Sequence, residues 1–207
     1  MTTSSSAASD YAVLAPSGRP GESAILSAAL EVLGAKGFNG MSMRDVASTA
    51  GTSLSNLYNY FPSKADLVAT LLTITNNDLL ARLEVAVSRA GDAAVDRLRA
   101  AIDAYVGFNV EKTTASLIGI SEIRYLAGDR RTSVIAARDR TESIFKQIVA
   151  DGVDAGEFRT PHAASAARSI VTMLAGMSLW YRPAGPLTRE QLAAEQTRFG
   201  LAIAEAR

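Results

Sequence analysis

The stretch from Ser53 to Phe61, SLSNLYNYF, concentrates side chains that form directional hydrogen bonds. A helix advances about 100° per residue, so this stretch divides into two faces. The polar side chains share one face: Ser55, Asn56 and Asn59. The apolar side chains share the other: Leu54, Leu57 and Phe61. The polar face carries no acid and no lysine, unlike most helix faces that only meet water, and this favours a binding role.

This combination of side chains suits the major groove of double-stranded DNA. Asparagine bonds bidentately to adenine, and serine accepts or donates to several base edges. Tyrosine hydroxyls and lysine hold phosphates, and Tyr58 and Tyr60 flank the polar face while Lys64 follows it. Ser42 and Arg44 open the preceding helix and have the same chemistry. From spacing alone, a small helical hairpin whose polar face meets water remains an alternative.

Local signals around this stretch predict two short helices joined by a tight turn. Ser42 is a good N-cap with Asp45 three residues later, close to a capping box. Gly51 ends that helix after about two turns, and Ser53 is the next N-cap candidate. Short helices separated by a glycine-containing turn are typical of a helix-turn-helix. An amphipathic helix from Glu22 to Lys36, stopped by Gly37, precedes them.

The remaining chain predicts more helices and no strand. Apolar residues recur at helical spacing in six further segments: Ser63–Ala90, Ala93–Lys112, Thr113–Leu126, Thr132–Ala155, Pro161–Trp180 and Thr188–Glu205. The AGDRR stretch, residues 127–131, is predicted to be a turn. We therefore expect an all-α protein of about nine helices, with a larger helical domain after the helix-turn-helix. Residues 1–18 are rich in serine and alanine, and we expect a disordered arm there.

Composition excludes several kinds of chemistry. The 207 residues include no cysteine and one histidine, His162, which rules out thiolate sites and histidine-rich metal sites. Acids and bases balance at 21 each, so net charge does not discriminate between partners. A helical enzyme would have to use paired carboxylates such as Asp151 and Asp154, which we interpret as solvated. We expect no enzyme activity, no cofactor, no metal, no membrane span and a cytoplasmic location.

The segment FNGMSMRDVASTAGTSLSNLYNYFPSKADLVATLL resembles the DNA-binding signature of the TetR family of bacterial transcriptional regulators. The resemblance spans about Ile25 to Leu72 and includes the Gly-x-Ser turn, LYNYF and PSKADL. It implies a DNA-binding domain at residues 19–66 and an effector-binding and dimerisation domain at residues 67–207. It also implies a homodimer on a pseudo-palindromic operator, most simply a repressor released by a small molecule.

Carried onto this sequence, the resemblance implies a set of DNA-contacting residues. They are Ser42, Arg44, Thr52, Ser53, Leu54, Ser55, Asn56, Tyr58, Asn59, Tyr60 and Lys64. Leu54 departs from the family pattern, which often has a basic or polar residue there. The helical wheel places Leu54 near the core, so both a core position and a contact to a thymine methyl stay open.

The second domain is expected to bind the effector and the second subunit. The segment Ala163–Trp180 is apolar on nearly every side, which indicates cover by a partner as well as by the core. The resemblance implies dimerisation through this helix and the last one. Pocket candidates mix apolar bulk with polar groups: Tyr105, Phe108, Asn109, Arg124, Tyr125, Met173, Met177 and Trp180. Arg124 lacks an obvious local partner, and an anionic ligand or a distant acid would satisfy it.

The segment LWYRPAGPLTREQL, Leu179–Leu192, resembles a loop of one TetR subgroup. That subgroup includes regulators of fatty-acid and steroid breakdown that respond to acyl-CoA thioesters. The alternative effector is a lipophilic or aromatic compound, as in regulation of efflux. A DNA-binding protein without an effector is a further alternative, but DNA binding alone does not need so large an apolar second domain.

Overall fold

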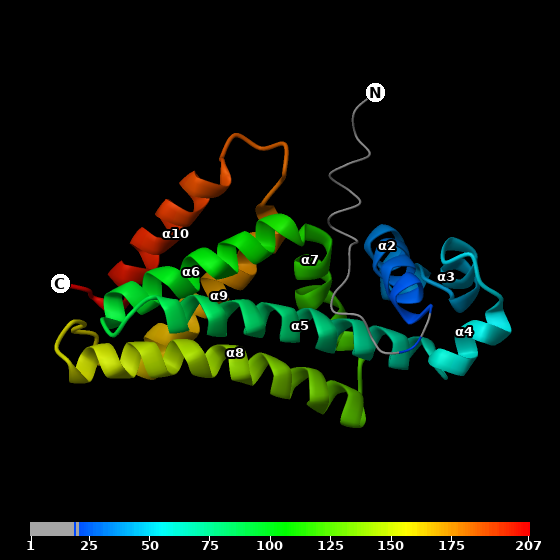
Figure 1. The fold of residues 1–207 in the computed structure, drawn as a ribbon, viewed down its shortest axis with the longest axis horizontal. Coiled ribbons are helices and arrows are strands. Elements are labelled where there is room, and N and C mark those ends of the chain that lie inside the picture. The colour runs from blue at the N-terminus through cyan, green and yellow to red at the C-terminus, as the bar shows by residue number, and fades with distance from the viewer. Residues whose placement is uncertain (1–18, 20) are drawn as a thin grey trace. The chain divides into compact units, whose positions relative to one another are not determined.

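A computed structural model describes residue 19 and residues 21–207, and the expected disordered arm lies outside these residues. The described part contains nine α-helices, one 3₁₀-helix and no strand, as the sequence predicted (Figure 1). The helices are α2 (Glu22–Gly40), α3 (Met43–Thr49), α4 (Leu54–Tyr60), α5 (Lys64–Arg89), α6 (Ala94–Glu111), α7 (Thr113–Ser121), η1 (Glu122–Tyr125), α8 (Gly128–Asp154), α9 (Ala163–Trp180) and α10 (Arg189–Ala204).

The chain forms two compact units. The first contains the described residues up to Asp78 together with Lys112–Ala137, and the second contains Leu79–Glu111 and Arg138–Arg207. The boundaries between the units fall within the residue ranges of α5 and α8 and between α6 and α7. The segment 112–137 therefore packs with the amino-terminal helices, although it lies far along the chain. The expected division of function at residue 66 stays a prediction.

The first unit is built around the apolar faces of α2 to α5. Leu57 and Phe61, which the wheel placed on the buried face, are both in its core. Leu54 is partly buried and packs against the edge of the same core. Burial of leucine- and phenylalanine-sized side chains contributes about 1.5–3 kcal/mol each, so these two anchors are a large part of what holds α4 to the core.

Helix α2 has a kink at Gly37, near its carboxyl end. The glycine's φ of 64° and ψ of 173° break the helical run, and a short helical stretch follows as far as Gly40. The sequence predicted a helix end at this glycine, and the structure shows a kink with a short extension beyond it. A positive φ costs a residue with a β-carbon, so glycine is the residue suited to this corner.

The second unit packs α6 against α9 and α10 around a continuous apolar core. Its core side chains include Leu98, Phe145, Ile170 and Leu192. Across the part of the chain that the structure describes, none of the helices is both long enough and apolar enough to span a bilayer.

Two predicted boundaries in the middle of the chain were wrong. The predicted helix Thr113–Leu126 tightens into the 3₁₀-helix η1 at Glu122. The predicted turn over residues 127–131 is shorter, because α8 begins at Gly128, where a φ of 56° completes the change of direction. Asp129 then lies in the first turn of α8, where its negative charge interacts favourably with the positive end of the helix dipole.

Candidate nucleic-acid interface

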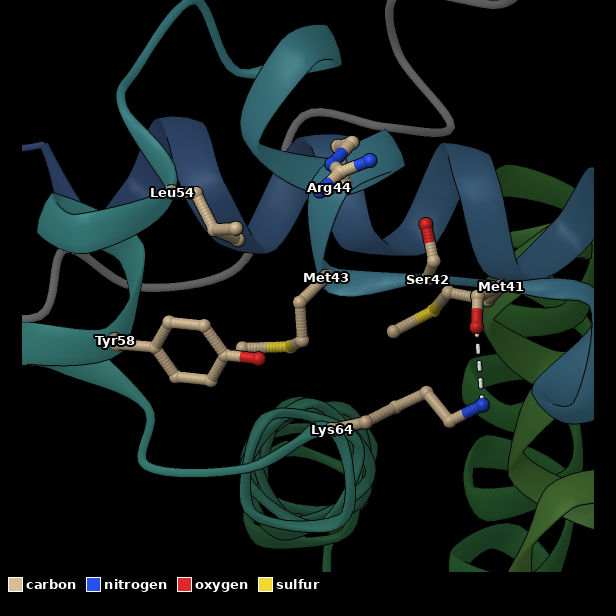
Figure 2. Close-up of a pocket in the computed structure, with 7 residues that line it drawn as sticks. All are labelled: Met41, Ser42, Met43, Arg44, Leu54, Tyr58 and Lys64. Carbon is tan, nitrogen blue, oxygen red and sulfur yellow. Dashed lines mark hydrogen bonds between the residues drawn. The ribbon is translucent and has the colours of Figure 1, made fainter.

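An open hollow of about 440 Å³ lies on the first unit, at the meeting of α3, α4 and α5 (Figure 2). Seven residues line it: Met41, Ser42, Met43, Arg44, Leu54, Tyr58 and Lys64. Five of the seven belong to the DNA-contacting set that the sequence predicted. Arg44 and Lys64 are cationic and no acid is among the lining residues, so the hollow suits an anion such as a phosphate.

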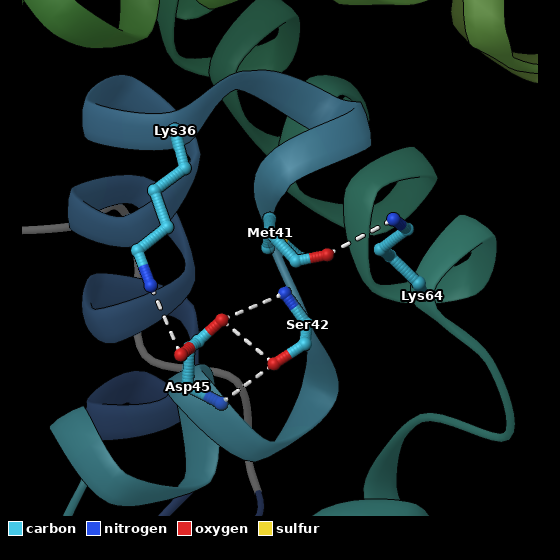
Figure 3. A network of polar contacts seen from close by, with 5 residues as sticks. All are labelled: Lys36, Met41, Ser42, Asp45 and Lys64. Carbon is cyan, nitrogen blue, oxygen red and sulfur yellow. Dashed lines mark hydrogen bonds and ion pairs between the residues drawn. The ribbon is translucent and has the colours of Figure 1, made fainter.

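The amino terminus of α3 is fixed by a reciprocal cap (Figure 3). The hydroxyl of Ser42 accepts from the N–H of Asp45 at 3.1 Å, and Asp45 accepts from the N–H of Ser42 at 3.0 Å and from its hydroxyl at 2.7 Å. Lys36 pairs with the same carboxylate at 3.0 Å. The hydrogen bond from the Ser42 hydroxyl, together with Lys36, lowers the pKa of Asp45 to about 2. Both donors of Ser42 are thus engaged by Asp45, and its predicted phosphate contact remains a prediction.

Helix α4 begins at the predicted N-cap. The Ser53 hydroxyl accepts from the N–H of Asn56 at 3.1 Å. The side-chain amide of Asn56 donates to the hydroxyl of Thr52 at 2.8 Å, a contact that the sequence analysis did not anticipate. The three predicted base-facing side chains, Ser55, Asn56 and Asn59, are all exposed. The two positions considered for Leu54 are compatible, because this side chain packs against the core edge and also lines the hollow.

Lys64 is more tightly held than a free phosphate anchor would be. Its ammonium donates to the carbonyl oxygens of Phe38 at 2.7 Å and Met41 at 3.0 Å. The same nitrogen lies 4.4 Å from the centre of the Phe38 ring, within the range of a cation–π contact. An ammonium has three N–H donors, so one remains for a phosphate in the hollow.

The two tyrosines of α4 have different surroundings. Tyr58 is 47% exposed and reaches into the hollow (Figure 2). Tyr60 is partly buried, and its ring receives the guanidinium of Arg19 at 4.8 Å and lies 6.5 Å from the ring of Phe61. Tyr60 also approaches Gly21, at the start of α2. Of the two predicted phosphate contacts, Tyr58 is therefore the better placed.

The predicted pocket residues separate into two groups. Arg124 and Tyr125 belong to the first unit, where Arg124 donates to the Ser121 carbonyl at 2.6 Å and lies over the ring of Tyr125. Arg124 is exposed and has these local partners, so its position does not by itself require an anionic ligand, and its role in a pocket stays a prediction. The other six candidates belong to the second unit: Tyr105, Phe108, Asn109, Met173, Met177 and Trp180.

Within the second unit, the candidates are mainly core residues. Tyr105 is buried beside Phe145, and burial raises its pKa to about 12. The side-chain amide of Asn109 donates to the Leu174 carbonyl at 2.8 Å and approaches the sulfur of Met177. Trp180, in contrast, is 49% exposed. Their role in binding an effector stays a prediction.

Sequence reasoning missed a second open hollow, of about 460 Å³, on the second unit. Its lining residues are Ala81, Arg82, Val85, Ala86, Arg89, Ala104, Gly107, Glu111 and Arg189. Arg82 pairs with Glu111 at 2.7 Å, and Arg189 pairs with Asp103 at 2.8 Å. The seven-residue spacing of Arg82 and Arg89, with Val85 between them, was the available signal that these side chains share a helix face. In the described residues, no cluster of three or more histidine, aspartate or glutamate side chains suits a metal ion.

Comparison with known proteins finds similarity to transcriptional regulators, both in sequence and in fold. The chain is 26% identical to the HTH-type transcriptional repressor KstR2 of Rhodococcus jostii, over 82% of this chain and 83% of that protein. Its fold matches a regulatory protein of the tetR family from Rhodococcus RHA1 with a TM-score of 0.84 at 24% identity, covering 91% and 99% of the two chains. It also matches AibR, solved with isovaleryl coenzyme A and operator DNA, with a TM-score of 0.81 at 20% identity, covering 90% and 100%.

Two family patterns cover most of the described chain. The pattern described as "Bacterial regulatory proteins, tetR family" matches residues 25–71, and "Tetracyclin repressor-like, C-terminal domain" matches residues 91–204. The second match alone spans more than half of the 207 residues. These matches confirm the expectation of a regulator rather than an enzyme. The chain belongs to the TetR family of bacterial regulatory proteins and is a DNA-binding transcriptional regulator.

Proposed function

We propose that this protein is a repressor that binds a pseudo-palindromic operator as a homodimer and is released by a small-molecule effector in the cytoplasm. In each subunit, α4 enters a major groove and presents Ser55, Asn56 and Asn59 to base edges. Arg44, Tyr58 and Lys64 hold the backbone phosphates beside the groove. The observation that carries this assignment is the acid-free hollow, in which these three side chains meet next to the exposed polar face of α4.

The last two helices support the homodimer. Three large apolar side chains on α9 and α10 remain solvent-exposed in the single chain: Leu179 at 57%, Trp180 at 49% and Phe199 at 50%. Large exposed apolar side chains on neighbouring helices are suited to a protein interface. In a two-fold interface, the copies of these side chains on both subunits would be buried. A dimer also supplies the two half-sites, one helical turn apart, that a helix-turn-helix regulator reads.

An acyl-CoA thioester is the effector class that we favour. The named relative KstR2 is a repressor, and the structural relative AibR was solved with isovaleryl coenzyme A, which supports this class by analogy. The hollow of the second unit adds a physical argument, because its lining combines three arginines with apolar residues such as Val85 and Ala86, beside one acid, Glu111. Such a lining suits the phosphates and apolar parts of coenzyme A. A lipophilic effector of an efflux regulator is the alternative.

One selection experiment tests DNA binding, symmetry and effector class together. The full chain is used to select duplexes from a random pool, and binding of the recovered duplex is then titrated with a panel of acyl-CoAs. We expect a two-fold symmetric sequence, two subunits per half-site pair, and weaker binding with at least one thioester. An asymmetric sequence bound by one subunit would contradict the dimer proposal. Release by uncharged lipophilic compounds, with no response to any thioester, would favour the efflux alternative.

A further inference from the structure

The corner between α2 and α3 has backbone groups that its own helices cannot satisfy. The kink at Gly37 interrupts the regular ladder, and residues 38–41 follow before the cap of α3 at Ser42. Backbone N–H and carbonyl groups at helix ends need other partners when they are withdrawn from water. The corner therefore depends on contacts from elsewhere in the first unit.

Two side chains of opposite charge supply these partners. The carboxylate of Glu122, in η1, accepts from the N–H of Phe38 at 3.0 Å, across a separation of 84 residues. Lys64, at the start of α5, donates to the carbonyls of Phe38 and Met41. The Phe38 ring stacks on Tyr125 with centres 4.9 Å apart and planes 6° from parallel, and it also meets the Lys64 ammonium.

Glu122 is a buried acid with no part in the DNA contacts proposed above. Its residue is 8% exposed, and its second carboxylate oxygen accepts from the Ser121 hydroxyl at 2.7 Å. Buried carboxylates persist where hydrogen bonds compensate the loss of water. Here one of those hydrogen bonds fixes the backbone immediately before the DNA-contacting helices.

We propose that Glu122 is a positioning residue for DNA binding. Together with Lys64 it forms a clamp on the corner, which we call the corner clamp, defined by Glu122, Lys64, Phe38 and Met41. The clamp sets where the chain leaves α2, and so it sets the placement of Ser42 and of the cap that begins α3. Figure 3 shows the Lys64–Met41 contact directly beside the Ser42–Asp45 cap. This inference rests on the proposed DNA-binding face.

The position of Glu122 in the chain makes the corner clamp sensitive to any movement of η1, and DNA affinity would change with it. Glu122 begins η1, which continues α7 without a break, and α7 starts at Thr113, two residues after α6 ends at Glu111. A shift or rotation of η1 would withdraw the acceptor from the Phe38 N–H and leave buried polar groups unpaired. The loss of such a hydrogen bond lowers the equilibrium constant for the process that depends on it, here DNA binding, by about 5- to 150-fold.

The test compares Glu122→Ala with Glu122→Gln in the full chain. In the free protein, amide exchange of Phe38 is measured by NMR, and affinity is measured for the duplex selected from a random pool. With Glu122→Ala we expect faster Phe38 exchange, an affinity loss of about 5- to 150-fold and an unchanged salt dependence, since Glu122 touches no phosphate. Glu122→Gln keeps an acceptor oxygen, so both properties should recover most of the way.

Val134→Ala is the matched control for general destabilisation. Val134 is fully buried in the same unit and belongs to α8, so its truncation lowers stability without removing a corner contact. Well below its unfolding temperature, this variant should keep Phe38 protection and DNA affinity. If Glu122→Ala does not fold, Glu122→Asp, which withdraws the carboxylate by one methylene, is measured in the same way.

Two results would overturn the proposal. The first is unchanged Phe38 exchange in Glu122→Ala, or in Glu122→Asp if that variant has to be used. The second is an affinity loss no larger than that of Val134→Ala. Failure of the DNA-binding face would look different: Asn56→Ala and Tyr58→Phe would bind the selected duplex normally while the Phe38 amide still responded to Glu122.

Discussion

Removing the Thr52 hydroxyl should weaken base discrimination through Asn56. The Thr52 hydroxyl accepts one N–H of the Asn56 side-chain amide at 2.8 Å, and both side chains lie at the beginning of α4. An asparagine amide has two N–H donors and one carbonyl acceptor. With one N–H held by Thr52, the remaining N–H and the carbonyl oxygen form the pair that bonds to N7 and N6 of adenine. Thr52 therefore orients the amide for reading.

The expected magnitudes follow from which hydrogen bonds each variant loses. Asn56→Ala loses the bidentate contact, which is worth about 1–3 kcal/mol of discrimination at one base pair. Thr52→Val keeps the shape of the side chain and loses one hydrogen bond, worth about 0.5–1.5 kcal/mol. Since 1.4 kcal/mol is tenfold, Thr52→Val should reduce discrimination at that base pair by about 2- to 12-fold. Thr52→Ser keeps the hydroxyl and should match the wild type.

The assay is competition between the selected duplex and duplexes substituted at each base pair in turn. We expect both variants to lose discrimination at the same base pair. In the Asn56→Ala background, Thr52→Val should have no further effect, because its partner is already absent. An equal loss from Thr52→Val in both backgrounds, or a loss at a different base pair, would refute an orienting role and would indicate a direct contact by Thr52.

Three further perturbations test the surrounding structure. Lys64→Met should lower DNA affinity, and it should reduce the slope of log affinity against log salt by about 0.9, because the third N–H of Lys64 meets a phosphate in the proposed complex. An unchanged slope would limit the role of Lys64 to the corner clamp. Gly37→Ala should destabilise the protein by about 1–3 kcal/mol in chemical unfolding, because residues with a β-carbon rarely adopt a φ of 64° with a ψ of 173°, although no atom lies in the way of the added methyl group. Gly119→Ala, in α7 and equally unobstructed, is the control and should not destabilise. The pKa of Asp45 is lowered to about 2 from 3.8, so its contribution to stability is present above about pH 4 and is lost as the pH falls toward 2. Asp45→Asn should therefore lose less stability than the wild type between pH 5 and pH 2.5 in thermal unfolding.

Local sequence signals predicted the DNA-binding helices well. Ser42 with Asp45, and Ser53 after Gly51, mark helix starts through contacts three residues apart, and the structure confirms both caps. The wheel also placed Leu57 and Phe61 correctly in the core. These features depend on neighbours within one helical turn, so their energetics are encoded locally.

Contacts between distant segments could not be predicted in this way. The N–H of Phe38 finds its acceptor 84 residues later, and no spacing rule connects Phe38 with Glu122. Arg124 was expected to need a partner, but in the structure its side chain is exposed and donates to the neighbouring Ser121 carbonyl. No long-range role was expected for Glu122, two residues earlier, whose carboxylate makes the contact with Phe38. Burial decides which of the two side chains needs a distant partner, and periodicity in a short 3₁₀ segment does not reveal burial.

The structure also changes how the PSK stretch after α4 should be understood. A lysine at this place was predicted as a phosphate anchor, which requires only charge and reach. In the structure the Lys64 ammonium donates to two carbonyls at the end of α2, which leaves a third N–H donor for a phosphate, and Lys64 also lines the hollow. A phosphate bound there would strengthen the cation's hold on the same corner, because the ammonium would be fixed from both sides. DNA binding and the ordering of the corner would then favour each other, and reciprocity requires that any loosening of the Glu122 side of the clamp lowers DNA affinity.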